Sequence, residues 1–141
     1  MIRQDLKNAE TYRNKLAAYA KSVGIKIKRK SMDVEGVYVP YTGVIWVDQD
    51  LEDVEEIATL LHELGHAWDD ALTSMSSSAR LQNAYDKIYT PHYTKHQVFL
   101  VLECEKRAWK YAKVIAKMLK IPLGKWFTKL HKEYINSYRE L

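Results

Sequence analysis

Apolar residues recur at helical spacing along five stretches of the chain. In the first stretch, residues 5–22, Leu6, Ala9, Leu16 and Ala20 fall on one helical face, and Gly24 follows as a C-terminal stop. The same spacing predicts helices over residues 50–72, 79–89, 95–120 and 125–139. The second of these helices opens with Asp and Glu, which suit the positive end of the helix dipole.

Three short apolar segments between the first two helices predict β-strands, at residues 25–28, 37–39 and 44–47. The turn at residues 40–43 contains Pro and Gly and joins the last two strands as a hairpin. The pattern therefore predicts an α+β fold with an N-terminal helix, a small three-stranded, mostly antiparallel sheet and a helical C-terminal half. Residues 1–141 are expected to form a single domain, because domains commonly hold roughly 100–200 residues.

The composition excludes several classes of protein. With 47% hydrophobic and 28% charged residues, the chain is not of the disordered type. Its single cysteine excludes an intramolecular disulfide and a cysteine-rich zinc finger. The longest apolar runs hold about five residues, against the ~20 that cross a bilayer. Because the first fifteen residues are polar and charged, no signal peptide is expected, and the chain is expected to be cytoplasmic without a membrane partner.

Charge is distributed unevenly along the sequence. Residues 31–79 hold eleven Asp or Glu and no Lys or Arg, whereas residues 1–30 and 80–141 are basic. An acidic middle could hold a cation, and basic ends could contact an acidic partner such as nucleic acid. Solvated helix faces explain most of the basic residues more simply, so nucleic acid is the less favoured partner.

One motif carries chemistry. His62-Glu63-Leu64-Gly65-His66 is an H-E-x-x-H sequence within the helix expected at residues 50–72. Four residues make about one helical turn, so both imidazoles project from one face and can share one metal ion. Imidazole nitrogen is a good ligand for zinc. Glu63 lies one step around the helix, where it could act as the general base on a zinc-activated water.

A catalytic zinc site needs a third protein ligand. On the helix expected at residues 95–120, Glu105 lies about 70° from the inward line and Glu103 about 130° from it, by the 3.6-residue period. We therefore favour Glu105, and we expect Glu103 to pair with Arg107 on the surface. Gly65 and the small Ala108 would permit close approach of the two helices. Glu103 remains an alternative, as do the histidines His92, His96 and His131.

Two segments together resemble a known family. The run at residues 59–67 contains the H-E-x-x-H sequence, and residues 105–112 form a downstream E-x-x-A-x-x-x-A pattern. With the strand segments before them, they resemble the ImmA/IrrE-type minimal zincins, small intracellular zinc proteases common in phages and mobile elements. The resemblance covers roughly residues 24–112. It implies that His62, His66 and Glu105 hold zinc and that Glu63 is the base.

The resemblance also implies an activity. Known relatives cleave transcriptional repressors, so the chain is expected to be a zinc-dependent endopeptidase acting on a specific intracellular protein, with a repressor as one candidate. One alternative is a SprT-like, nucleic-acid-associated zincin, because residues 96–99 echo an H-x-x-F pattern and would supply a later histidine ligand. The gap from His66 to Glu105, with an added segment at about 73–97, admits that alternative. Another is a non-catalytic, zinc-containing binding protein that acts through its basic helices.

Secondary features yield further expectations. Asp69 or Asp70 could hydrogen-bond a ligand imidazole and fix its orientation. Cys104 is expected to be an inert, buried thiol. His92, Tyr93 and His96 lie in or near a loop that is expected to be exposed; the alternative is that this loop closes over the site, where a Tyr or His could polarise an oxyanion. The strand at residues 44–47 is expected to be an edge strand that pairs with an extended substrate.

Overall fold

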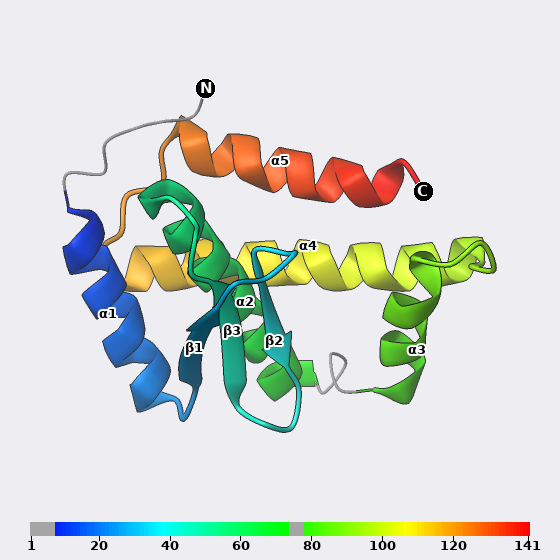
Figure 1. The fold of residues 1–141 in the computed structure, drawn as a ribbon, viewed down its shortest axis with the longest axis horizontal. Coiled ribbons are helices and arrows are strands. Elements are labelled where there is room, and N and C mark those ends of the chain that lie inside the picture. The colour runs from blue at the N-terminus through cyan, green and yellow to red at the C-terminus, as the bar shows by residue number, and fades with distance from the viewer. Residues whose placement is uncertain (1–7, 74–77) are drawn as a thin grey trace.

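The computed structural model describes residues 8–73 and 78–141 (Figure 1). In chain order its elements are α1 (Ala9–Ser22), β1 (Lys26–Lys30), β2 (Gly36–Val39), β3 (Val44–Asp48), α2 (Asp53–Thr73), α3 (Ala79–Ile88), α4 (Lys95–Met118) and α5 (Lys125–Arg139). The α+β class is confirmed, and each expected helix is present to within a few residues at each end. Residues 5–7 of the first expected helix, and residues 74–77 of the loop before α3, lie outside the described residues.

Local capping fixes where the later helices begin. The hydroxyl of Ser78 accepts a hydrogen bond from the amide of Leu81 at 3.2 Å and so caps α3. Thr94 and Gln97 form a reciprocal capping box at the start of α4. At the other end of α4, Lys120 adopts a left-handed conformation with φ of 56°, which stops the helix.

The sheet is mixed rather than mostly antiparallel, so that part of the expected fold is wrong. Its strand order is β1-β3-β2, with β2 antiparallel and β1 parallel to β3. The β2–β3 hairpin is present as expected. Hydrogen bonds at both ends lock β1 in the parallel register: the amide of Lys26 donates to the carbonyl of Gly43, and the amide of Gln49 donates to the carbonyl of Lys30. The parallel pairing joins segments that no short turn connects, so turn residues alone could not reveal it.

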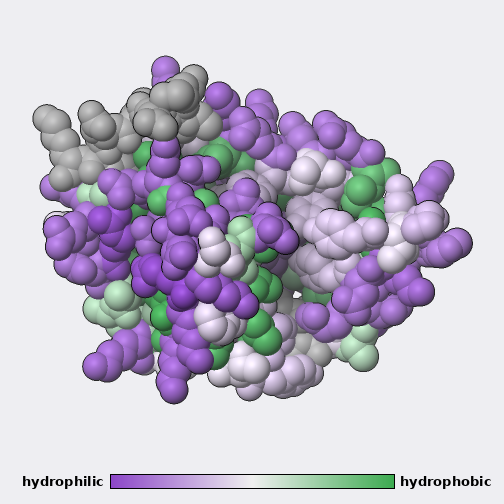
Figure 2. All heavy atoms as spheres, viewed as in Figure 1, coloured by the Kyte–Doolittle hydropathy of each residue, from purple (hydrophilic) through white to green (hydrophobic). Residues whose placement is uncertain are grey.

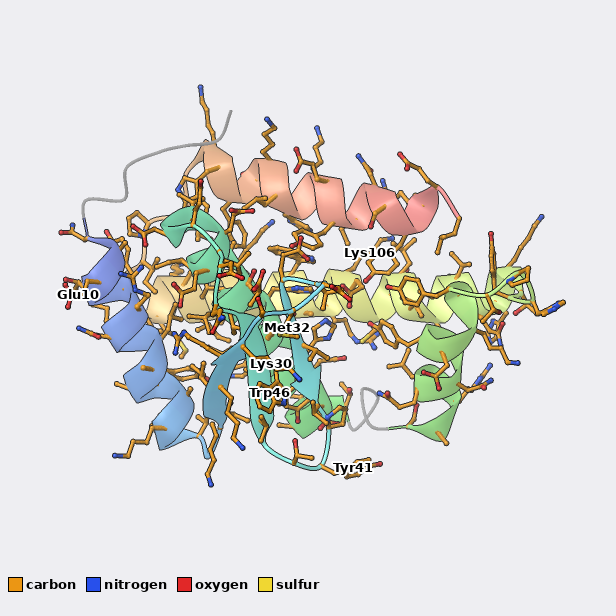
Figure 3. All side chains as sticks on the ribbon, in the orientation of Figure 1. Glu10, Lys30, Met32, Tyr41, Trp46 and Lys106 are labelled. Atoms are coloured by element: carbon orange, nitrogen blue, oxygen red, sulfur yellow. The ribbon has the colours of Figure 1, made fainter. Side chains whose placement is uncertain are left out.

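Strand β3 lies in the centre of the sheet. Ile45 and Val47 are fully buried and point to the helical side, whereas Trp46 faces the other way. The ammonium groups of Lys28 and Lys30 lie 5.4 Å and 4.5 Å from the ring centre of Trp46 on this outer face. Figure 3 labels Lys30 and Trp46. Because β3 is paired on both sides, the expectation that residues 44–47 form a substrate-binding edge is wrong. The edge strands are β1 and β2.

Helices α2 and α4 form the centre of the fold, with α5 beside α4 and α1 beside β1 (Figure 1). Gly65 of α2 meets Ala108 of α4 so closely that a Cβ on Gly65 would lie 2.0 Å from the carbonyl oxygen of Ala108. This close crossing agrees with the role expected for the two small residues. It brings the H-E-x-x-H face of α2 against α4.

Two groups of buried side chains stabilise this arrangement. The larger lies between the sheet, α1, α2, α4 and α5, and it includes Leu16, Ile45, Leu61 and Trp109. The smaller joins α3 to the first half of α4, and it comprises Leu81, Ala84, Ile88, Val101 and Cys104. Among the described helices, none combines the length and the apolar composition that a bilayer crossing requires.

Candidate metal centre

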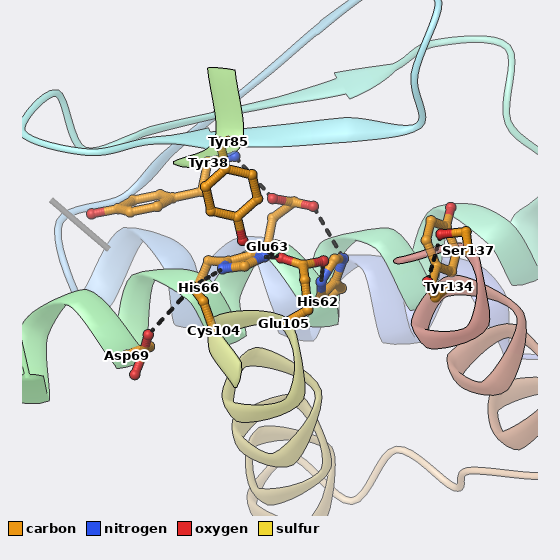
Figure 4. Close-up of polar contacts among 10 residues, drawn as sticks. All are labelled: Tyr38, His62, Glu63, His66, Asp69, Tyr85, Cys104, Glu105, Tyr134 and Ser137. Carbon is orange, nitrogen blue, oxygen red and sulfur yellow. Dashed lines mark hydrogen bonds and ion pairs between the residues drawn. The ribbon is translucent and has the colours of Figure 1, made fainter. Parts of the chain in front are cut away.

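Two imidazoles of α2 and one carboxylate of α4 meet inside the protein (Figure 4). The rings of His62 and His66, one helical turn apart, have centroids 4.7 Å apart. Oε1 of Glu105 lies 3.2 Å from Nε2 of His62, and Oε2 lies 2.7 Å from Nε2 of His66. One ligand-type atom from each residue lies within 4.8 Å of the others. These three side chains, which we call the metal-type group, could bind a metal ion.

The structure separates Glu105 from Glu103 clearly. Glu105 is only 2% exposed, whereas the side chain of Glu103 is 40% exposed and its Oε1 lies 3.4 Å from Nζ of Lys106. Arg107, expected to pair with Glu103, instead donates a hydrogen bond from Nε to Asp69 at 2.7 Å. The fully buried carboxylate of Asp69 explains this choice, because a buried charge requires a partner.

The remaining histidines lie elsewhere in the fold. His92 is exposed, His96 contacts the guanidinium of Arg80, and His131 stacks on Trp109 with centroids 4.9 Å apart. Within the described residues, none of these three belongs to the metal-type group. Residues 92–96 do not line the cavity beside that group, so in this structure they do not close over it.

The electrostatics of the group favour positive charge between its members. Burial lowers the pKa of His62, but the charges of Glu105 and Glu63 outweigh it and raise that pKa to about 9. Burial opposes protonation of His66 too, yet Glu105 holds its pKa well above the ordinary value. Burial raises the pKa of Glu105, but the two histidines bring it well below its ordinary value. Protons on the imidazoles can supply this positive charge, and a metal ion can replace them.

One buried nitrogen of the group makes no hydrogen bond with any described residue, and this agrees with a role as a metal ligand. Nε2 of His62 is buried and makes no hydrogen bond within the described part of the chain, although Oε1 of Glu105 lies near it. Leaving such a nitrogen unpaired costs about 1–3 kcal/mol. Ligation of a metal ion would satisfy it, and two imidazoles with one carboxylate are donors that zinc accepts. Trp109 stacks on His62 with centroids 4.4 Å apart and an angle of 11°, which fixes the ring plane.

Glu63 lies next to the group without belonging to it. Its Oε2 lies 3.3 Å from Nδ1 of His62, and its Oε1 accepts a hydrogen bond from the amide of Tyr38 at 2.9 Å. This bond requires β2 to lie against α2, and Gly36 permits it, since a Cβ there would lie 2.7 Å from Cγ2 of Thr59. Glu63 also lines the adjoining cavity. Its carboxylate is therefore placed to take a proton from a water molecule in that cavity.

The cavity beside the group has a volume of about 500 Å³. Side chains from β2, α2, α3, α4 and α5 line it, and Figure 2 shows the surface hollowed between β2 and α3. Sequence reasoning missed all five tyrosines among the lining residues: Tyr38, Tyr85, Tyr89, Tyr134 and Tyr138. The four-residue spacing of Tyr85 with Tyr89, at the end of α3, and of Tyr134 with Tyr138, on α5, is a signal that could have found four of them.

The hydroxyls of three cavity tyrosines carry protons that can form hydrogen bonds. Tyr85 donates to Oε2 of Glu105 at 2.6 Å. Burial and the charge of Glu105 raise the pKa of Tyr85 well above its ordinary value. Burial raises the pKa of Tyr134 and of Tyr138 as well, helped by Glu35 and Glu105 respectively. These hydroxyls therefore keep their protons at neutral pH.

The two aspartates that follow His66 have different roles. Asp70 accepts a hydrogen bond from the hydroxyl of Tyr38 at 2.8 Å and so orients a cavity side chain. Oδ2 of Asp69 lies 3.7 Å from Sγ of Cys104, and that sulfur lies 3.8 Å from Nδ1 of His66. Cys104 is buried as expected. Its polar contacts on both sides, however, make it more than apolar filling.

Comparisons of the chain with models of protein families, with curated proteins and with solved structures find no match. The resemblance to the ImmA/IrrE-type zincins thus stays a prediction from the sequence. What the site can do must follow from its own residues and their geometry.

Proposed function

We propose that this chain is a zinc-dependent endopeptidase of the ImmA/IrrE minimal zincin type. One observation carries the proposal: the metal-type group of His62, His66 and Glu105 lies beside a separate glutamate, Glu63, in the wall of a cavity of about 500 Å³. Structural zinc sites are usually closed by four protein ligands, whereas catalytic sites keep an open position. Three donors that adjoin a cavity support the catalytic type.

Each residue of the site then has a role in peptide hydrolysis. His62, His66 and Glu105 hold the zinc ion. Zinc, when bound, supplies a Lewis acid that lowers the pKa of a water molecule towards ~7 and polarises a carbonyl group. Glu63 takes the proton of the attacking water while the amide of Tyr38 keeps its carboxylate in place. As the peptide C–N bond breaks, Glu63 passes this proton to the amine nitrogen that leaves.

The tyrosines and the edge strand serve the substrate. The hydroxyls of Tyr134 and Tyr138 can donate hydrogen bonds to the oxygen of the attacked carbonyl, whereas Tyr85 supports the ligand Glu105. Residues 34–38 and 40 line the cavity along the edge strand β2, so an extended substrate segment would pair with β2, not with β3. We place the substrate among specific cytoplasmic proteins, with a transcriptional repressor as the first candidate from the family resemblance.

The geometry supports the alternatives less well. A SprT-like site would need His96 at the metal, and His96 contacts Arg80 outside the metal-type group. A non-catalytic binding protein would need neither a cavity beside the donors nor Glu63 at its wall. If the basic helices bind nucleic acid, retention of the chain on DNA should fall steeply with salt, which a simple titration would reveal.

A peptide-cleavage assay with a matched variant tests the proposal. The zinc-loaded chain is incubated with a library of peptides from a digested proteome, and new termini are identified by mass spectrometry. Native protein should create new termini at a restricted set of sequences. Glu63→Gln should hold as much zinc and create none, whereas the surface variant Glu103→Gln should match native protein. Equal cleavage by Glu63→Gln would contradict the base assignment, and native protein without zinc would contradict the metal site.

A further inference from the structure

We propose that Cys104 is a positioning residue for His66. Its thiol links the imidazole to the buried carboxylate of Asp69, which is paired with Arg107, and so holds His66 in the tautomer that presents Nε2 to the metal. This inference rests on the proposed metal site, and it assigns that site a support outside the H-E-x-x-H sequence.

Three contacts in a row carry the inference. Figure 4 shows His66, Cys104 and Asp69, which make the first two. Nδ1 of His66 lies 3.8 Å from Sγ of Cys104, within the range of hydrogen bonds to sulfur. The same sulfur lies 3.7 Å from Oδ2 of Asp69, and Oδ1 of Asp69 accepts a hydrogen bond from Nε of Arg107 at 2.7 Å. Cys104 and Asp69 are both 0% exposed, so the protein itself must supply partners for their polar atoms.

The direction of each hydrogen bond follows from the groups involved. A neutral imidazole that ligates a metal through Nε2 carries its proton on Nδ1. That N–H needs an acceptor, and the sulfur of Cys104 is placed to be one. An ionised carboxylate only accepts, so the single thiol hydrogen of Cys104 is donated to Asp69. Arg107 donates to the other oxygen of Asp69, so this carboxylate accepts hydrogen bonds from both sides and ends the series.

An aliphatic side chain could not serve this purpose. Cys104 belongs to the small apolar cluster of α3 and α4, where an aliphatic residue of similar size would pack equally well. Metal-ligating histidines usually donate their second N–H to a carboxylate or a carbonyl. Here the thiol stands between the imidazole and the carboxylate, so Asp69 acts on His66 through the sulfur.

The first test is zinc affinity, measured by competition with a chromophoric chelator. Cys104→Ala should weaken zinc binding about 10–100-fold, the range found when such supporting partners are lost. Cys104→Ser keeps a donor and an acceptor and should recover most of that loss. Val101→Ala, a buried control in the same cluster, removes apolar volume alone and should leave zinc affinity near the native value. Native affinity in Cys104→Ala, or an equal loss in Val101→Ala, would overturn the proposal.

The second test needs no metal. Because the chain has a single cysteine, its infrared S–H stretching band reports Cys104 alone. Donation to a carboxylate lowers that frequency, so Asp69→Asn should raise it, whereas Asp70→Asn should not. If Asp69→Asn does not fold, the native band is compared with that of unfolded protein and should lie lower. If the S–H band does not differ in whichever of these comparisons is made, the thiol does not donate to Asp69, and the proposal for Cys104 is refuted even if zinc binds. If the chain binds no zinc, the proposed function is refuted instead.

The tautomer has its own readout. In zinc-loaded protein, the ring ¹⁵N chemical shifts of His66 should show a proton on Nδ1, and Cys104→Ala should make that proton exchange faster with water. A proton on Nε2 in loaded native protein would overturn the assignment.

Discussion

Gly65 allows α2 and α4 to approach closely, and replacing it with alanine tests how firmly this crossing fixes the metal-type group. A Cβ at Gly65 would lie 2.0 Å from the oxygen and 3.2 Å from the Cα of Ala108. Backbone atoms cannot rotate away, so the helices must separate by about 1 Å or more to reach ordinary contact. Such overpacking costs about 1–3 kcal/mol, while alanine gains about 1 kcal/mol over glycine within a helix. Because the contact is with backbone atoms, we expect the overpacking cost to lie at the upper end of its range, about 3 kcal/mol. After the gain of about 1 kcal/mol from alanine, the free energy of unfolding should fall by about 2 kcal/mol.

Urea unfolding followed by circular dichroism measures this loss. Glu105 lies one turn before Ala108 on α4, so displacing Ala108 also moves Glu105 away from the histidines, and zinc affinity should fall together with stability. The control is Ala18→Gly on the exposed face of α1. It should lose about 1 kcal/mol from helix propensity alone and keep native zinc affinity. A Gly65→Ala variant as stable as native protein would refute the reasoning about the crossing.

Two further predictions concern the surroundings of the site. Tyr85→Phe removes the hydrogen bond to Oε2 of Glu105 and should weaken zinc binding about tenfold. The control Tyr89→Phe changes an exposed tyrosine and should keep native zinc affinity. Equal affinities of the two variants in a chelator competition would contradict this prediction. Burial, with the charges of Lys113 and His62, lowers the pKa of His131 to about 4. Since the unfolded value is about 6.5, His131 contributes stability above that pH, and this contribution is lost as the pH falls towards 4. His131→Phe keeps an aromatic ring on Trp109 but cannot titrate. Between about pH 7 and about pH 5 this variant should lose less stability than native protein, as measured by urea unfolding, and an equal loss would contradict the prediction.

The sequence alone was sufficient to predict those site residues whose inward direction depends only on their spacing along one helix. The H-E-x-x-H spacing places two imidazoles on one side of α2, and the helical phase of α4 separates Glu105 from Glu103. Both inferences use only the 3.6-residue period, which holds whatever the helix packs against. The caps at Ser78 and Thr94 likewise act within a few residues.

Features that join distant segments could not be predicted in this way. The parallel pairing of β1 with β3, and hence the central place of β3, depends on how the sheet packs on the helices. Arg107 pairs with Asp69, 38 residues away, because the crossing of α2 and α4 buries that carboxylate. The thiol of Cys104 meets His66 across the same crossing. Neither contact leaves a periodic signal in the sequence, since each is fixed only by the tertiary packing.

Zinc stoichiometry tests the central claim most directly. Native protein, Glu105→Ala and Glu103→Ala are each reconstituted with zinc, freed of excess metal and measured by native mass spectrometry. The account predicts about one zinc per chain in native protein and in Glu103→Ala, and a large loss in Glu105→Ala that is still correctly folded, because three protein ligands define the site. No zinc in native protein, or equal zinc in both variants, would contradict it.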